Sequence, residues 1–255
     1  MNRIFTLFAL LIGVPFFISG CGNHDDDTIS VAVSSHLPPF TFIEYGQLRG
    51  FEIDLITVAA RKMGKSVAVK DVGTFDNMFS FVKSGKADVA VGAITIEDAQ
   101  ANSTFHSISY MSGQLGVVLK KGVSLDNINS FIGRNISTQE GVIYEKWAKE
   151  NFRDSIITKR GNLRISAEEL EEEKIQMIVT NLHTACRISR RSYWLYCESI
   201  PNTTHEYVII TKNDDKFIKE LNATLHKMQE DGEMETIIKR WRMDAEHQCV
   251  NSNVN

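Results

Sequence analysis

The stretch "SVAVKDVGTFDNMFSFVKSGKADVAVGAIT", residues 66–95, carries the pattern that decides the fold. Its first residues alternate and are rich in valine, which is typical of a β-strand. Residues 75–85 follow with a helical pattern that ends at Gly85, a residue suited to the turn after a helix. Residues 87–95 hold few charges, as buried parallel strands do. This order predicts the α/β class.

The preceding residues extend the same alternation of strands and helices. Residues 28–35 read as a strand, and residues 51–64 read as a helix. In that helix Ile53, Ile56 and Ala60 recur at a spacing of three or four residues, and Gly64 is placed to end it. The alternation therefore predicts a mainly parallel sheet with helices on both faces.

A second set of elements begins near Leu125. It contains a strand near residue 138, helices over 142–152 and 166–174, a strand over 175–180, a helix over 182–192, strand-like runs over 193–200 and 206–212, and helices over 215–232 and 234–241. The chain is long enough for one large domain or two small ones.

The N-terminus has the layout of an export signal. Met1 to Arg3 give a positive start, residues 4–18 are apolar, and "ISGC" ends at Cys21. This ending resembles a bacterial lipobox, which implies that residues 1–20 are a lipoprotein signal peptide, that Cys21 carries the lipid and that residues 21–27 form a tether. An ordinary signal peptide, or an uncleaved anchor, is the alternative.

Charge and metal-ligand spacing exclude several classes of function. The formal net charge is −4, and loss of Arg3 with the leader would make it −5, which argues against a nucleic-acid partner. The glutamates of residues 168–173 point in different directions on a helix, so we interpret them as a solvated face. No histidine pair has metal-ligand spacing. We therefore expect no metal and no cofactor.

Three cysteines follow the leader: Cys186, Cys197 and Cys249. Disulfides persist in the oxidising compartments that exported chains enter. Because Cys186 and Cys197 are close in sequence, we expect them to be the pair that joins a helix to the next strand. An odd number leaves one thiol over.

The ordered stretches "VAVSSHLPPFTFIEYGQLRGFEIDLITVAARKMG", "FDNMFSFVKSGKADVAVGAITI" and "YMSGQLGVVLKK" closely resemble one family. It is the bacterial extracellular solute-binding proteins of family 3, which serve ABC importers of polar amino acids. "STQEGVIYEKWAKE" is similar to the start of that family's second lobe, and "DGEMETIIKRW" to its closing helix. The resemblance covers nearly all of the chain after the leader.

The resemblance implies a two-lobed clamp of the type II periplasmic-binding-protein fold. Lobe 1 would comprise residues 28–119 and 208–241, lobe 2 residues 120–207, and residues 242–255 a polar tail. The crossings would lie near 118–122 and 204–208. A ligand would lie between the lobes, at the carboxyl ends of the strands, and hinge closure around it would be the working motion.

Several positions depart from the grip that the family uses for free amino acids. The arginine that binds the ligand's carboxylate aligns with Ala99, or with Gln100 after a shift of one residue. The Gly-Thr pair that the second lobe offers to the same carboxylate, at a helix N-terminus, appears as Gly141 and Val142, so the hydroxyl is missing. The aspartate that binds the ammonium appears as Asn181. The aromatic residue before the two prolines appears as Leu37.

Other positions keep features that the family uses. Phe75 would stack on the ligand. The segment Ala93, Ile94, Thr95 would offer backbone groups and the Thr95 hydroxyl. Gly141 and Val142 would offer the amides of a helix N-terminus. Asn181 would donate or accept a hydrogen bond from the far lobe.

The departures predict a ligand that lacks a free carboxylate, is larger, or is cationic near Glu97 and Asp98. Alternatively, another cation replaces the missing arginine, and the candidates are Arg134, Lys120 and Lys121. Without a catalytic motif, the favoured function is a monomeric, lipid-anchored receptor that presents a small polar solute to an ABC permease.

Two other functions stay open. One is a sensor or surface lipoprotein that kept the fold without transport. The other is a periplasmic enzyme of the dehydratase type on the same scaffold, which would need a general acid in the cleft. Glu97, Asp98, Glu140 and His36 are the residues that could serve.

Overall fold

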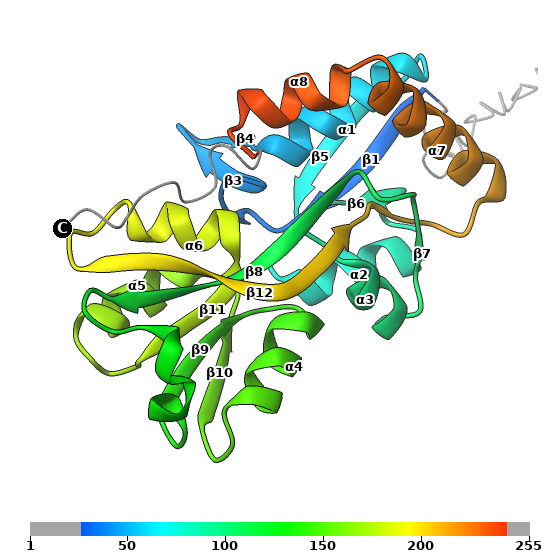
Figure 1. Ribbon diagram of the computed structural model, residues 1–255. Coiled ribbons are helices and arrows are strands. Elements are labelled where there is room, and N and C mark those ends of the chain that lie inside the picture. The colour runs from blue at the N-terminus through cyan, green and yellow to red at the C-terminus, as the bar shows by residue number, and fades with distance from the viewer. Residues whose placement is uncertain (1–26, 244–255) are drawn as a thin grey trace, which may run out of the picture.

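The structure, a computed structural model, describes residues 27–243. The predicted signal peptide, the lipidation site at Cys21, nearly all of the tether and Cys249 lie outside the described residues. The described chain forms two lobes, each built on its own five-stranded sheet, which the long strands β8 (Met111–Lys120) and β12 (Leu195–Tyr207) connect (Figure 1). The α/β class and the two-lobed type II fold are confirmed.

The sheet of lobe 1 has the strand order β5-β1-β6-β13-β7. Its strands are β1 (Thr28–Val33), β5 (Ser66–Asp71), β6 (Val89–Ala90), β7 (Phe105–His106) and β13 (Ile210–Thr211). β1 pairs in parallel with β5 and β6, whereas β13 is antiparallel to both of its neighbours. The returning strand β13 therefore completes the sheet that the first part of the chain begins.

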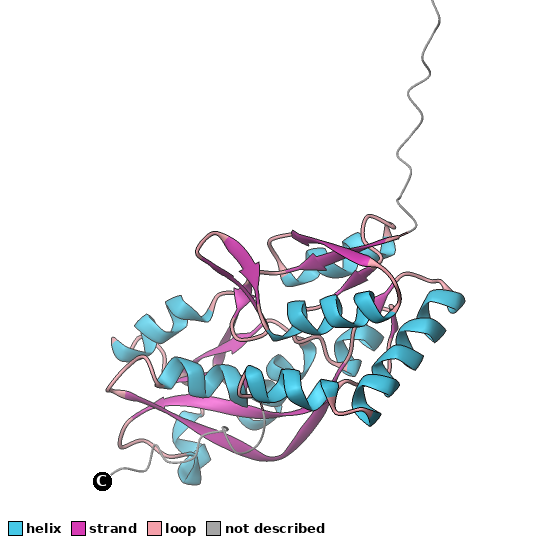
Figure 2. Ribbon diagram, turned by 90° about the horizontal axis from the view of Figure 1, so that it is seen from above, coloured by secondary structure: helices cyan, strands magenta, loops and turns pink. Residues whose placement is uncertain are grey.

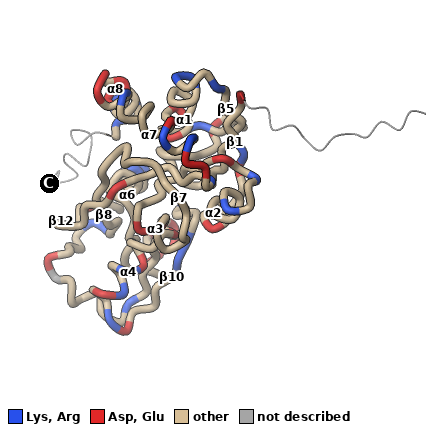
Figure 3. The backbone as a smooth tube through the Cα atoms, turned by 90° about the vertical axis from the view of Figure 1, so that its right-hand side faces the viewer, with Lys and Arg blue, Asp and Glu red and all other residues tan. Residues whose placement is uncertain are grey.

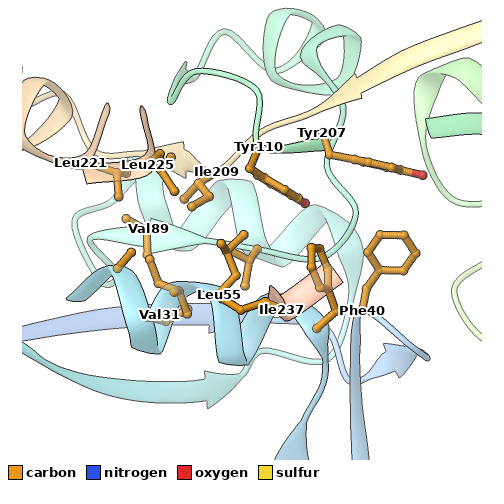
Figure 4. Close-up of a cluster of buried hydrophobic side chains, with 14 of the residues drawn as sticks. Val31, Phe40, Leu55, Val89, Tyr110, Tyr207, Ile209, Leu221, Leu225 and Ile237 are labelled. Carbon is orange, nitrogen blue, oxygen red and sulfur yellow. The ribbon is translucent and has the colours of Figure 1, made fainter. Parts of the chain in front are cut away.

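Helices cover both faces of this sheet. They are α1 (Phe51–Lys62), α2 (Phe75–Lys83), α3 (Ile96–Ala101), α7 (Asp215–Glu230) and α8 (Glu233–Arg240). On one face, α1, α7 and α8 bury Leu55, Leu221 and Ile237 against Val31 and Val89 of the strands (Figure 4). On the other face α2 buries Met78, Phe79 and Val82. The predicted helices at 51–64 and 75–85 are confirmed.

The sheet of lobe 2 has the order β10-β9-β11-β8-β12. Its other strands are β9 (Asn135–Gln139), β10 (Ile156–Arg160) and β11 (Met177–Asn181), and the remaining elements are α4 (Val142–Asn151), α5 (Leu163–Glu171), α6 (Leu182–Ser189) and a 3-10 helix, η1 (Leu125–Phe131). α4 packs on one face, while α5 and α6 pack on the other. Each lobe thus has the layered α/β construction that the sequence predicts.

The first crossing between the lobes differs from the expectation. β8 pairs with β11 and β12 of lobe 2, so the chain leaves lobe 1 between His106 and Met111, earlier than the expected 118–122. The second crossing lies between Tyr207, where β12 ends, and Ile210, where β13 begins. β8 and β12 lie side by side in both views (Figures 1 and 2). An apolar run alone does not reveal which sheet it joins, and this accounts for the misplaced boundary.

A small antiparallel sheet projects from lobe 1 beside the junction of the lobes (Figure 1). It contains β2 (His36–Leu37), β3 (Thr41–Glu44) and β4 (Gln47–Arg49). Gly50 follows with a φ of 145°, and a Cβ there would lie 1.9 Å from the Phe40 carbonyl oxygen. Only glycine permits this approach, which fixes the start of α1 against the β2–β3 turn.

Acidic and basic residues are interspersed over both lobes of the described chain (Figure 3). Most charged pairs are on the surface, including the pairs of Lys149 with Glu145 and of Lys239 with Glu235.

In residues 27–243, none of the helices has the length and apolarity that a membrane span requires.

The structure joins Cys186 of α6 to Cys197 of β12 in a disulfide, the pair that we expected. Reduction should lower the free energy of unfolding by about 3 kcal/mol, since the bond closes a loop of the unfolded chain and so lowers its entropy. Urea denaturation with and without reductant measures this difference. Alkylation in denaturant without reductant should label Cys249 alone in a chain that begins at residue 22. Labelling of all three thiols would contradict the pairing.

Candidate ligand-binding site between the two lobes

The segment after β6 turns sharply and begins a short helix. β6 ends at Ala90, whereas we expected this strand to continue to residue 95. Ala93 has a φ of 53°, in the left-handed region, and turns the chain toward the helix. Thr95 then caps α3: its hydroxyl accepts from the Asp98 amide at 3.2 Å, and the Asp98 carboxylate accepts from the Thr95 amide at 3.0 Å. This reciprocal pair is a capping box, and both residues are fully buried.

Asp98 also reaches across to lobe 2. Its Oδ1 accepts a hydrogen bond of 2.7 Å from the amide of Val142, the first residue of α4. The N-cap of α4 is Gly141, which has no side chain to bind that amide, and the helix dipole favours an anion there. A carboxylate of the protein therefore occupies the helix N-terminus at which the resemblance placed the ligand's carboxylate.

Gly141 permits the close packing of this junction. Its φ is 132°, and a Cβ there would lie 2.9 Å from the ring of Tyr144 and 3.6 Å from Asp98 Oδ1. Burial raises the pKa of Asp98 despite the lowering effect of the bonds from Val142 and Thr95. The contact between the lobes is thus built around a desolvated acid.

A second buried acid, Glu52, binds the backbone of the turn at Ala93. Glu52 of α1 is fully buried, and its two oxygens accept from the Ala93 amide at 2.9 and 3.0 Å. The Tyr110 hydroxyl donates to the same carboxylate. Burial raises the pKa of Glu52 to about 7, although these hydrogen bonds lower it. Glu52 and Asp98 together fix the segment from Ala93 to Thr95.

Aromatic side chains close the space beside this segment. The ring of Phe40 lies 5.3 Å from that of Tyr207 and 6.3 Å from that of His183, which belongs to lobe 2. Tyr110 stacks on Tyr207 at 6.3 Å (Figure 4). Phe40, Tyr110 and Tyr207 are almost completely buried, so the centre of the junction is packed with side chains.

The far lobe contributes Asn181 at the start of α6. Its side-chain oxygen accepts from the Thr184 amide at 2.9 Å, which caps the helix. Its amide nitrogen donates to Gln139 at 3.1 Å, and Thr180 donates to the same oxygen. All of these groups are buried, so Asn181 serves the internal structure of lobe 2 here.

The remaining predicted residues lie in two places. Phe75, Ile94 and Ala99 belong to the lobe 1 core under α2, where the ring of Phe75 lies 5.2 Å from that of Phe79. Leu37 also belongs to the lobe 1 core, and it lines a cavity between the lobes as well. The structure thus brings Thr95 to Gly141 and Val142 through Asp98, and it leaves the side chains of Phe75, Ile94 and Ala99 in the core.

The three cations that could replace the missing arginine lie outside the cavity between the lobes. Lys120 pairs with Glu173, and the Lys121 ammonium lies 4.1 Å from the centroid of the Tyr193 ring. Arg134 is exposed at the start of β9. None of the three lines the cavity described next.

The interlobe cavity has a volume of about 680 Å³. Lobe 1 lines it with Ser35, His36, Leu37, Pro38, Phe42, Ile43 and Glu44; lobe 2 lines it with Asn162, Leu163, Arg164, Ala167, Glu168, Glu171, Thr184, Arg187, Ile188, Arg191, Ser192 and Leu195. This volume is in the range of small-molecule sites. Among the described residues, no cluster of side chains has the composition of a metal site.

Asp98 has a different role from the one that the sequence predicts. It does not face a cationic ligand, and the pattern Thr95-x-x-Asp98 is the signal of a capping box. The sequence does not predict Thr184, Arg187 and Arg191 as site residues. Their arginine-rich composition is a visible signal, but their position on the cavity depends on how the two lobes meet.

Comparison with known proteins agrees with the architecture. A sequence model of the bacterial extracellular solute-binding proteins, family 3, matches residues 29–244. A probable histidine-binding protein of Campylobacter jejuni subsp. jejuni is 27% identical over an alignment of 259 positions. The alignment covers 96% of this chain and 100% of that protein.

Solved structures show the same arrangement. An ancestral arginine-binding protein bound to arginine is similar with a TM-score of 0.76 and 25% identity, covering 86% of this chain and 99% of that one. The substrate-binding protein of an amino acid ABC transporter of Streptococcus pneumoniae, bound to L-arginine, has a TM-score of 0.75 at 21% identity, covering 84% and 94%.

Proposed function

Because the chain belongs to the bacterial extracellular solute-binding proteins, family 3, we propose that it is the solute-binding component of an ABC importer. Its ligand would be an amino acid or a related small polar solute. The observation that carries this proposal is the interlobe cavity of about 680 Å³, to which both lobes contribute side chains. A ligand there would touch both lobes and would therefore favour their closure around β8 and β12.

The proposed pocket departs from the usual grip on a free amino acid. The amide of Val142 at the N-terminus of α4 is already bonded to Asp98. A ligand carboxylate placed beside that amide would lie next to the Asp98 charge. Two unit charges about 4 Å apart repel each other by about 4 kcal/mol at an effective dielectric constant of about 20. We therefore infer that the ligand does not place a carboxylate at α4.

We further propose that the chain is anchored by a lipid at Cys21 and works as a monomer outside the cytoplasmic membrane. The support is the small-small-Cys ending after the apolar leader. The family description, extracellular solute-binding proteins, agrees with such a location. A permease in the membrane would be the partner that recognises the closed lobes.

We propose no catalytic step for the residues that an enzyme could use. Glu97 is exposed, and Asp98 is bonded to Thr95 and Val142. His36 lines the interlobe cavity from an exposed position. A general acid needs a proton to give at a reacting atom, and Asp98 already directs both of its oxygens at protein donors.

Thermal unfolding of the chain from residue 22 onward tests the proposed function. The panel would contain amino acids, short peptides, polyamines and organic acids. A bound solute present at about 100 times its Kd stabilises the folded state by about 2.7 kcal/mol. We expect it to raise the midpoint by about 5 to 10 °C. If no compound shifts the midpoint, the importer proposal fails, and a surface lipoprotein without transport becomes the better interpretation.

A further inference from the structure

The lobe 2 wall of the interlobe cavity carries three arginines that differ in their partners. Arg164 pairs with Glu168 at 2.6 Å. Within residues 27–243, no carboxylate lies within 4.0 Å of Arg187 or Arg191 to form an ion pair. Arg187 and Arg191 nevertheless line the same cavity. These two neighbouring guanidinium groups, which make no such ion pair, place two positive charges at this wall.

Of these two arginines, Arg187 is the one that contacts both lobes. Its guanidinium carbon lies 5.6 Å from the centroid of the Phe42 ring, which belongs to lobe 1, so the side chain spans the gap between the lobes. Its Nε is buried and has no hydrogen-bond acceptor. Burial lowers the pKa of Arg187, and the charge of Arg191 lowers it further.

Thr184 lies three residues earlier on α6 and therefore on the same side of the helix as Arg187. Thr184 lines the cavity, is only 4% exposed, and has a buried hydroxyl with no hydrogen-bond partner. Buried polar groups of folded proteins almost always have partners. A hydroxyl and a guanidinium N–H that both lack one at a cavity wall therefore point to an acceptor supplied by a ligand.

The other groups around the cavity restrict what that acceptor is. Glu44 is the acid whose charge acts on Arg187, and it lies 3.7 Å from Arg49. The acids Glu168 and Glu171, and His36, also line the cavity. Its remaining wall is largely apolar, with Leu37, Leu163, Ile188 and Leu195. Such a wall suits an organic body better than it suits a bare inorganic anion.

We propose that Thr184 and Arg187 form a carboxylate-binding subsite on α6, with Arg191 supplying a second positive charge. The ligand would be a small organic acid, including an amino acid held by its α-carboxylate at α6 instead of α4. A planar guanidinium matches a carboxylate with two parallel hydrogen bonds. This inference rests on the proposed function in one respect, namely that the interlobe cavity is where the solute binds.

Matched ligand pairs test the subsite by calorimetry. L-arginine and L-histidine would be compared with agmatine and histamine, which lack the α-carboxylate. R187Q should weaken binding of an amino acid by about tenfold to a hundredfold, the usual range for a hydrogen bond to a charged group. T184V should weaken it by about tenfold or less. Neither variant should weaken binding of the decarboxylated partner.

R164Q is the control, because Arg164 lines the same cavity but is already paired with Glu168. Its effect on amino acid binding should be less than about threefold, as is usual for an exposed ion pair. If R187Q and T184V bind the amino acids as the parent chain does, the subsite is refuted while the proposed function stands. If R164Q weakens binding as much as R187Q, general attraction by positive charge replaces the subsite.

A second measurement does not need the natural ligand. The Arg187 Nε–H signal in ¹H–¹⁵N spectra, assigned by its loss in R187Q, would be followed while sodium succinate is added. A saturable shift that equal sodium chloride and sodium sulfate do not produce would support the subsite. An unchanged signal, or the same shift with sulfate, would overturn it. A response to succinate without binding of any amino acid would support the subsite and refute an amino acid ligand.

Discussion

Asp98→Ala should destabilise the protein by about 4 kcal/mol, the largest effect that we expect from a single substitution. The carboxylate accepts from the Thr95 amide at 3.0 Å, the Thr95 hydroxyl at 2.9 Å and the Val142 amide at 2.7 Å. Each buried donor left without a partner costs about 1 to 3 kcal/mol. Urea denaturation of both proteins at pH 7 measures the change in the free energy of unfolding.

Glu97→Ala is the matched control for Asp98→Ala. Glu97 precedes Asp98 in α3 but is exposed, so its loss should change the free energy of unfolding by less than about 0.5 kcal/mol. Equal, small effects of the two substitutions would mean that Asp98 does not hold the lobes together. Asp98→Asn should fall between them, because it keeps an acceptor for one donor but loses the charge.

The role of Asp98 changes what the α4 N-terminus can do. In the alanine variant, the Val142 amide would regain the ability to bind an external anion, since Gly141 offers no side chain in its place. In the native chain, the capping box of the short helix α3 fixes the Asp98 carboxylate, which accepts the hydrogen bond from the α4 N-terminus. The proposed shift of the ligand's carboxylate to α6 is consistent with this occupation of α4.

The layered fold could be predicted from the sequence because its signals are local. The apolar spacing of α1 and the glycines that follow α1 and α2 belong to the elements themselves: Gly64 has a φ of 72° and Gly85 a φ of 70°. The lobe boundary is different, because the strand β8 is equally apolar whichever sheet it joins. β8 joins the sheet of lobe 2 because it pairs with β12, a segment far away in the sequence.

The candidate site could be predicted only in part. The resemblance placed Gly141 and Val142 at a helix N-terminus, and the structure has them there. α3 is too short for a periodic pattern, so its cap was the only local signal of Asp98's position. Arg187 could not be identified as unpaired from the sequence, because pairing depends on which acids of both lobes come near it. Charge balance at a cleft is a tertiary property.

The second large effect is expected in the pH dependence of stability, through Glu52. Burial raises its pKa from 4.5 to about 7 in the folded state. Between these values the folded chain holds a proton that the unfolded chain has released, so stability must fall as the pH rises through this window. Since one pH unit corresponds to about 1.4 kcal/mol, the loss from pH 4.5 to pH 8 should be about 3 kcal/mol.

Glu52→Gln should remove that contribution, because an amide of the same shape does not ionise. Its oxygen can still accept from the Ala93 amide, and the turn at Ala93 should persist. The free energy of unfolding of the variant, minus that of the parent protein, should therefore rise by about 3 kcal/mol from pH 4.5 to pH 8. Urea denaturation at several pH values measures it. Glu97→Gln, at an exposed position, should follow the parent curve.

Glu52→Gln should keep a contribution of the same sign from Asp98. Burial also raises the pKa of Asp98, so that this acid too favours folding less as the pH rises. Adding Asp98→Asn to Glu52→Gln should remove this contribution. His205 should then leave a slope of the opposite sign, because burial lowers its pKa and stability rises with pH through its titration. If Glu52→Gln and the parent protein instead lose stability in parallel from pH 4.5 to pH 8, Glu52 ionises normally in the fold. Its carboxylate would then hold the Ala93 turn as a charged acceptor, and the buried acids would not govern how firmly the junction holds.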